Sequence, residues 1–235
     1  NRSLQGNRLR VQGVTAAANA TNLQNISSSN TERRMMSVSG GATFDIMDRY
    51  TVDLALRQDG YSLFGSEQRW QTYGRASAAW LVANEDWFPV DALSMFTLRA
   101  SYGTAGRAPR FEAQYETYSI GSGGALSAST LGNRNLRPEV NTEIELGAEF
   151  ELFNRWGASV TYSNALIDDQ ILPVPVSAST GFNQQWQNAG AMRSKTLEAA
   201  LTLPFVQGQD FTWSATATYA RNRSIVERLD VPPFF

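Results

Sequence analysis

Residues 143–152 read EIELGAEFEL, and apolar and polar residues alternate along the whole of this stretch. The apolar set is Ile144, Leu146, Ala148, Phe150 and Leu152. The residues between them are four glutamates and a glycine. A helix would scatter both sets around its circumference, whereas a strand places one set on each face. The stretch therefore predicts a β-strand that has one apolar face and one polar face.

The same alternation continues on both sides of this stretch, for example in FTWSATATY at 211–219. It predicts strands near 35–44, 49–57, 70–82, 94–103, 143–152, 155–165, 193–203 and 210–221, and a weaker one near 7–16. Most of these segments span about nine to eleven residues, the length that a tilted strand needs to cross a bilayer. The chain is therefore predicted to be all-β, with antiparallel strands joined in an up-and-down order.

The connections between the predicted strands differ in length in a regular way. The short ones are 45–48, 153–154 and 204–209, and the intermediate 83–93 lies on the same side. The long ones are 58–69, 104–142 and 166–192. Short and long connections alternate, so all the long ones fall at one end of the sheet. This layout is typical of outer-membrane barrels, whose turns are periplasmic and whose long loops are extracellular. We therefore expect the three long loops to be extracellular.

The composition excludes several classes of function. The 235 residues include no Cys and no His, and 20 Lys+Arg stand against 22 Asp+Glu. Without these side chains there is no disulfide framework, no thiolate metal site, no Ser-His-Asp triad and no HExxH zinc site. A net charge of −2 without a basic cluster gives no electrostatic footprint for nucleic acid. We expect no cofactor, no metal and no enzymatic activity.

Alternation alone does not decide whether the apolar face meets lipid or a dry core. The apolar set carries aromatic residues near the strand ends, namely Tyr50, Trp80, Phe96, Tyr102, Trp156, Tyr162, Phe211 and Tyr219. Such residues form the interfacial girdles of membrane barrels, and the opposite set of Thr, Ser, Gly and charged residues suits a wet lumen. Both features favour lipid. The alternative of another class is a soluble β-sandwich that binds glycans, which would need no detergent.

Several motifs resemble one family of membrane proteins. RQDGYSLFG at 57–65 and RWQTYGRASAAW at 69–80 resemble the RxDGSSxFG…AW segment of SusC/RagA-like TonB-dependent outer-membrane transporters. The stretch 132–172, from GNRNLRPE to DQIL, resembles a segment common to TonB-dependent receptors. STGFNQQWQNAG, which begins at 179, resembles the TGF…NaG element of the SusC branch. The motif residues are Arg57, Asp59, Gly60, Phe64, Gly65, Asn135, Leu136, Pro138, Glu139, Asn188 and Gly190. Arg134 and Thr196 depart from the family pattern, which has Pro and Gly there.

The resemblance implies that residues 1–235 are an internal segment of a barrel domain, with about 8–9 strands of about 22. It also implies a bacterial outer-membrane location and energised uptake of oligosaccharides or peptides. The expected partners are outer-membrane lipid, a SusD-like surface lipoprotein, and the TonB complex through a plug and a TonB box that lie outside this chain. A siderophore or cobalamin receptor is the alternative within transport. The SusC-type residues around 57–65 and 179–190 argue against it.

The individual motifs support structural interpretations. RQDG at 57–60 is interpreted as a strand end followed by an Asp-Gly turn, since glycine supplies the positive φ that such turns need. Pro138 keeps the residue before it extended, so NLRPE is expected to set a strand entry. The glutamates of 143–152 are expected to pair with arginines on neighbouring strands. Asp168 and Asp169 lack the DxDxDG calcium pattern and are interpreted as a polar loop edge.

Aromatic residues in the two longest loops are the candidates for ligand contact. They are Phe111, Tyr115, Tyr118, Phe182 and Trp186. Sugar rings and peptide side chains both stack on exposed aromatic faces, which bury a large area at a small cost in entropy. The alternative is that these side chains pack loop against loop and roof the barrel.

Overall fold

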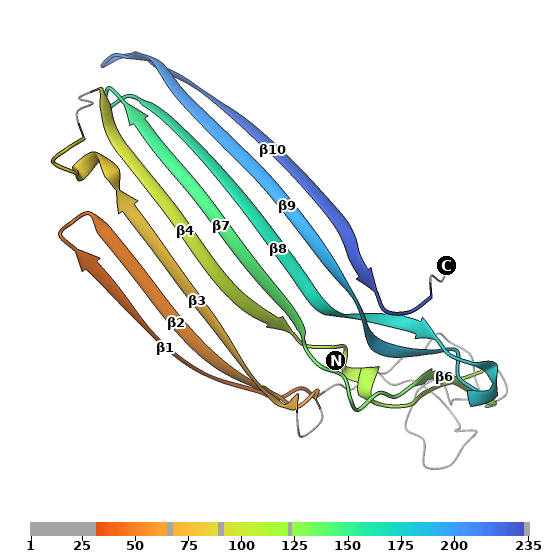
Figure 1. Ribbon diagram of the computed structural model, residues 1–235. Coiled ribbons are helices and arrows are strands. Elements are labelled where there is room, and N and C mark those ends of the chain that lie inside the picture. The colour runs from red at the N-terminus through yellow and green to blue at the C-terminus, as the bar shows by residue number, and fades with distance from the viewer. Residues whose placement is uncertain (1–31, 65–67, 89–91, 122–123, 233–235) are drawn as a thin grey trace.

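The computed structural model describes residues 32–64, 68–88, 92–121 and 124–232 (Figure 1). They form a single ten-stranded sheet. The strands are β1 (Met35–Ile46), β2 (Tyr50–Tyr61), β3 (Trp70–Leu81), β4 (Leu93–Arg107), β5 (Thr117–Ile120), β6 (Leu126–Leu131), β7 (Glu139–Leu152), β8 (Trp156–Pro175), β9 (Gln184–Gln207) and β10 (Thr212–Leu229). The 3₁₀ segments that lie wholly within the described residues are η3 (Val82–Asn84), η4 (Phe111–Gln114) and η5 (Ala178–Thr180). No helix among the described residues is both long and apolar enough to span a membrane.

The eight long strands follow one another as an antiparallel meander. Their order in the sheet is β1-β2-β3-β4-β7-β8-β9, and β10 pairs with β9. Figure 1 shows them side by side in one curved layer, with β1 and β10 at its two edges. The meander confirms the all-β prediction and the up-and-down order. The structure adds a hairpin of β5 and β6 within the β4–β7 connection, and two residues of β6 pair in parallel with the start of β9.

Two tight turns set the register at one end of the sheet. Met47, Asp48 and Arg49 join β1 to β2, and Phe153, Asn154 and Arg155 join β7 to β8. The first two residues of each connection have positive φ, and the amide of the third donates a hydrogen bond to the carbonyl of the last strand residue, as in a type I′ turn. Such turns match the right-handed twist of the strands, so each fixes which residues face each other across the pair.

Several strands run further than the sequence predicted. β8 continues to Pro175 and β9 begins at Gln184, although the prediction ended one at 165 and began the other at 193. The pairing of β8 with β7 ends at Asp168, so beyond it β8 and β9 form a two-stranded ribbon. One edge of β8 is open there, which is where a strand tolerates proline. The apolar and polar alternation stops in this ribbon, so periodicity could not identify it. The weak strand predicted near 7–16 lies outside the described residues.

Buried hydrophobic side chains are few and lie mostly at the long-loop end of the sheet. Leu63, Phe64, Leu136 and Val174 are among them. By contrast, Leu146 in the middle of β7 is 51% exposed. No described element covers the sheet, so its many apolar side chains have no partner within the described chain. The fold is a single layer, which is the form expected of a piece of a barrel wall.

Candidate functional site

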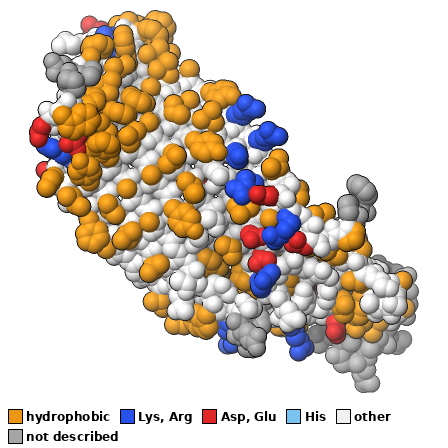
Figure 2. All heavy atoms as spheres, in the orientation of Figure 1, with side chains coloured by type: hydrophobic (Ala, Val, Ile, Leu, Met, Phe, Trp, Pro, Cys, Tyr) orange, Lys and Arg blue, Asp and Glu red, His pale blue; other side chains and the backbone are white. Residues whose placement is uncertain are grey.

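The strand register gives the sheet one apolar face and one polar face. One row of paired residues from β2 to β10 reads Tyr50, Trp80, Leu98, Ala148, Val160, Ala199 and Tyr219. A row on the opposite face reads Asp53, Ser77, Ser101, Glu145, Ser163, Thr196 and Asn222. We call these the apolar face and the polar face. Figure 2 shows hydrophobic side chains spread over the apolar face. Exposed apolar surface of this extent marks contact with a membrane or with another protein.

Ion pairs and hydrogen bonds link neighbouring strands across the polar face. The Arg99 guanidinium on β4 lies 2.9 Å from a carboxylate oxygen of Glu149 on β7. Glu149 thus pairs with an arginine of the neighbouring strand, as the sequence predicted. Glu143 instead accepts a hydrogen bond of 2.7 Å from the Ser163 hydroxyl. The described residues include no group of three or more acidic side chains that could hold a metal ion.

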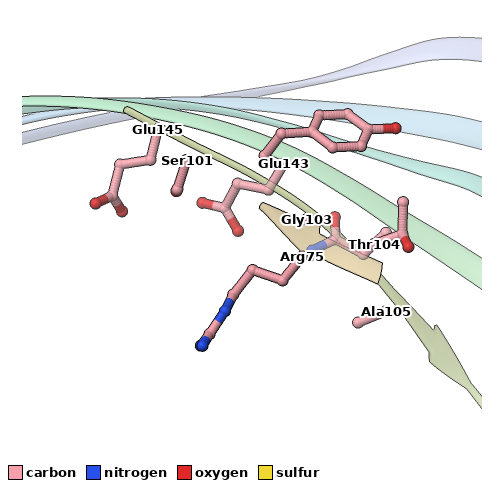
Figure 3. A pocket seen from close by; sticks show the side chains of 9 residues that line it. Arg75, Ser101, Gly103, Thr104, Ala105, Glu143 and Glu145 are labelled. Atoms are coloured by element: carbon pink, nitrogen blue, oxygen red, sulfur yellow. The ribbon is translucent and has the colours of Figure 1, made fainter. Parts of the chain in front are cut away.

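A shallow pocket of about 270 Å³ lies on the polar face between β3, β4 and β7. Arg75, Ser101, Asn141, Glu143 and Glu145 are among the residues that line it. Figure 3 shows the two glutamate carboxylates and the Arg75 guanidinium projecting from the same side of the sheet. Arg75 also pairs with Asp53 of β2. Carboxylates and a guanidinium arranged side by side offer acceptors and donors to a polar solute that passes over them.

The five loop aromatics all lie at the long-loop end, and each contacts another side chain. The ring of Phe111 lies 5.7 Å from that of Tyr115, and the ring of Tyr118 lies 5.8 Å from that of Phe182. The guanidinium of Arg110 lies 5.4 Å from the Trp186 ring. These contacts fit the alternative in which the aromatics pack loop against loop. Ligand contact stays a prediction for all five, and Tyr115 and Tyr118 are 47% and 55% exposed.

The Asp-Gly turn predicted at RQDG is wrong, because these residues lie inside β2 and pair with β3. Gly60 serves a close approach instead: a Cβ atom there would lie 2.7 Å from the ring of Trp70. Asp59 is fully buried, and its carboxylate lies 3.0 Å from the Arg57 guanidinium. The Tyr61 hydroxyl donates a hydrogen bond of 3.3 Å to the same carboxylate. The motif therefore builds a buried polar centre at the long-loop end of β2.

Phe64, another motif residue, packs against Tyr61 beside this buried polar centre. Phe64 is 2% exposed and meets the ring of Tyr61 edge-on at 5.9 Å. The remaining residue of this motif, Gly65, lies outside the described residues.

The NLRPE motif and Asn188 hold the β4–β7 connection against β8. The Asn188 side chain accepts a hydrogen bond of 2.9 Å from the Arg137 amide and donates one of 2.9 Å to the Arg137 carbonyl. It also donates one of 2.7 Å to the carbonyl of Asp169. Arg137 in turn lies 2.6 Å from the Asp169 carboxylate. Asp169 has positive φ at a β-bulge of β8, so it belongs to a strand and not to a loop edge.

The other residues of these two motifs surround the same junction. Leu136 and Pro138 are buried, and Glu139 begins β7 and accepts a hydrogen bond of 2.8 Å from the Ile171 amide. The Asn135 amide donates to the side chain of Asn133. Gly190 is buried where a Cβ atom would lie 3.0 Å from the Arg228 carbonyl. Each motif residue therefore has a structural contact at the junction.

Replacing Asn188 with alanine should loosen the β4–β7 connection, because three hydrogen bonds to main-chain groups are lost together. We expect a cost of about 1–3 kcal/mol, since a hydrogen bond contributes about 0.5–1.5 kcal/mol and water replaces part of the loss at the exposed Arg137. Limited proteolysis of the full barrel that contains this chain would report faster cleavage within 108–138. Gln187→Ala is the matched control, since among the described residues its side chain bonds only to Gln185. Equal cleavage of both variants would contradict this role.

Sequence analysis missed two side chains that organise the ends of the sheet. Asn133, within the quoted GNRN stretch, donates a hydrogen bond of 2.8 Å to the Trp186 carbonyl. At the short-turn end, Glu85 accepts hydrogen bonds from Tyr50 and from Trp80 and pairs with Arg49 at 3.1 Å. The Tyr50 bond, followed by that of Trp80, lowers the pKa of Glu85 below its usual value. Asn133 stands out in the sequence only as part of the GNRN stretch, and no quoted motif contains Glu85.

A family model described as TonB dependent receptor-like, beta-barrel, matches residues 2–233. The chain belongs to this family. Among TonB-dependent receptors, it is 26% identical over 208 residues to TonB-dependent receptor P3 of Formosa agariphila, covering 84% of the chain and 21% of that protein. It is 25% identical over 214 residues to TonB-dependent receptor SusC of Bacteroides thetaiotaomicron, covering 85% of the chain and 21% of SusC. The chain thus spans about a fifth of the length of these curated relatives.

A solved structure shows a similar arrangement of strands. The RagAB peptide importer in its closed-closed state superposes with a TM-score of 0.73 at 26% identity, over 83% of this chain and 22% of that one. The similarity to SusC and to RagAB confirms the resemblance inferred from the motifs. It also explains the open sheet, since a segment of a barrel has two edges that the remainder of the barrel would pair.

Proposed function

We propose that this chain forms part of the wall of a SusC/RagA-type TonB-dependent transporter in a bacterial outer membrane. The observation that carries the proposal is the contrast between the two rows of paired residues, one wholly apolar and one wholly polar across seven strands. The apolar face contacts lipid and the polar face lines the aqueous lumen, as in membrane barrels. The segment catalyses no reaction. It forms part of the lumen wall along which the solute passes.

In this proposal the long-loop end faces the outside of the cell and meets the nutrient first. The substrate class is an oligosaccharide or a peptide, and the RagAB peptide importer supports the second. The exposed Tyr115 and Tyr118 are the residues that contact it, because they offer aromatic faces beside the lumen mouth. A SusD-like lipoprotein would close over the same end. The TonB complex would act through parts of the barrel protein outside this chain.

Uptake by cells that carry or lack the full-length protein tests the proposal. Deleting its gene should abolish growth on one class of oligosaccharide or peptide, and a protonophore should stop uptake of the labelled solute.

The variant Tyr115→Ala/Tyr118→Ala should raise the concentration for half-maximal uptake by about three- to tenfold, the equivalent of one or two lost stacking contacts. Phe153→Ala, an exposed aromatic at the opposite end, is the control. Unchanged growth on every oligosaccharide and peptide tested would refute the transporter.

A further inference from the structure

Tyrosines mark where the apolar face ends on its long-loop side. Tyr219 on β10 lies in the same row as Val160 of β8. Tyr162 on β8 lies one row further toward the long loops, and Tyr102 on β4 lies one row beyond that. All three are exposed. Tyrosine concentrates at the boundary between hydrocarbon and headgroups because its ring is apolar and its hydroxyl polar. These three residues define what we call the tyrosine line.

Three cations lie immediately beyond the tyrosine line, on the apolar face itself. The row that contains Tyr102 reads Leu54, Ala76, Tyr102, Ile144, Asn164, Lys195 and Arg223. It is apolar in the first four strands and becomes cationic at β9 and β10. Arg221 lies in the preceding row, opposite Leu197. Lys195, Arg221 and Arg223 are all exposed, and Lys195 is the only lysine of the chain.

Among the described residues, no carboxylate lies within ion-pair distance of these three cations. Lys195 lies directly opposite Arg223, and like charges at such a cross-strand position destabilise a sheet. None of the three forms an ion pair with another described residue. The acidic side chains on the neighbouring stretches are already paired: Glu227 with Arg193, and Asp168 and Asp230 with Arg228. Figure 2 shows charged side chains of both signs gathered along one border of the hydrophobic field.

We propose that Lys195, Arg221 and Arg223 bind the phosphate of a lipid headgroup in the leaflet next to the long loops. The inference rests on the proposed function, since it requires the apolar face to contact lipid. A lipid whose acyl chains lie along Leu197 and Leu201 places its headgroup just beyond the tyrosine line, where these cations project. Two guanidinium groups and one ammonium group match the several oxygens of a phosphate and make charge-assisted hydrogen bonds to it. The phosphate relieves the repulsion between Lys195 and Arg223.

Native mass spectrometry of the full barrel in detergent tests the site with two lipids that differ only in phosphate. Phosphatidic acid and diacylglycerol with the same acyl chains are the probes. Each basic residue near an anionic lipid headgroup contributes about fivefold in affinity. Lys195→Gln/Arg223→Gln should therefore weaken phosphatidic acid binding by about twenty- to thirtyfold, with diacylglycerol binding unchanged. The control Arg107→Gln/Arg134→Gln removes two exposed cations that lie away from the apolar face, and it should bind as the wild type does.

The alternative outcomes separate this proposal from the one on which it rests. Equal binding of the two lipids by the wild-type barrel, in a protein that inserts into vesicles, overturns the phosphate site and leaves the transporter wall intact. A barrel that does not insert into vesicles at all refutes the lipid-facing assignment as well. Displacement of phosphatidic acid by an equimolar amount of inorganic phosphate would show that the site takes free phosphate, which also overturns the lipid assignment.

Discussion

Replacing Val160 with arginine should lower the free energy of unfolding of the membrane-embedded barrel by about 2–4 kcal/mol, the cost of a cation on the lipid face at the bilayer midplane. Val160 is 43% exposed in the middle of the wholly apolar row, between Ala148 and Ala199. Arginine there must hold a charge in hydrocarbon or pull the side chain toward the headgroups. Denaturant unfolding of the full barrel in lipid vesicles measures the change, and Ala148→Arg should behave similarly.

The neighbouring residue gives a matched control for that result. Thr161 lies on the polar face, opposite Glu198 of β9. An arginine at this position stays in water and gains a carboxylate within reach, so Thr161→Arg should change the stability by less than about 1 kcal/mol. Equal destabilisation by Val160→Arg and Thr161→Arg would show that the apolar face does not contact lipid.

Replacing Arg57 with alanine should also lower the free energy of unfolding of the barrel by a large amount. Its partner Asp59 is fully buried, so Arg57→Ala leaves a carboxylate without its counterion. Breaking a buried ion pair in this way costs about 3–5 kcal/mol. We expect about 2–4 kcal/mol, because Arg57 is half exposed and water screens part of the interaction. Thermal or denaturant unfolding of the full barrel measures the loss.

A double-mutant cycle of Arg57 and Asp59 shows whether the loss of stability in Arg57→Ala comes from the unpaired charge of Asp59. Asp59→Asn removes the charge and keeps the shape, so Arg57→Ala should cost much less in its presence than alone. The side chain of Arg57 also lies over the ring of Tyr73, at 5.9 Å from its centroid. If Arg57→Ala cost the same in the wild-type barrel and in the Asp59→Asn variant, the packing on Tyr73 and not the ion pair would account for the effect.

The sequence predicted the central part of each long strand because lipid and water impose an alternation that can be read directly. In β7, the glutamates and the apolar residues between them fall on opposite faces, as expected. Toward and beyond the end of their pairing with β7 and β10, β8 and β9 continue as LIDDQILPVP and QQWQNAGAM without a period. Periodicity therefore ended both strands too early.

The long-loop end of the sheet could not be derived from local patterns. Gly60 looked like a turn residue because an Asp-Gly pair favours turns, but its role depends on Trp70, ten residues away. Asn188 meets Arg137 only after two further strands have formed. Contacts between such distant positions leave no local signal. The motif resemblance identified these residues, while their geometry came from the structure.

The tyrosine line also gives the inclination of the strands in the membrane. Tyr219, Tyr162 and Tyr102 lie on β10, β8 and β4, and each step toward β4 advances two residues along the strands. Four strand spacings of about 4.8 Å therefore correspond to an advance of about 13 Å. If the tyrosines share one depth, the strands lean from the membrane normal by about 35°, within the range for membrane barrels. Strands must tilt by such an angle for a sheet to close into a barrel. This segment therefore has the strand tilt that the complete barrel requires.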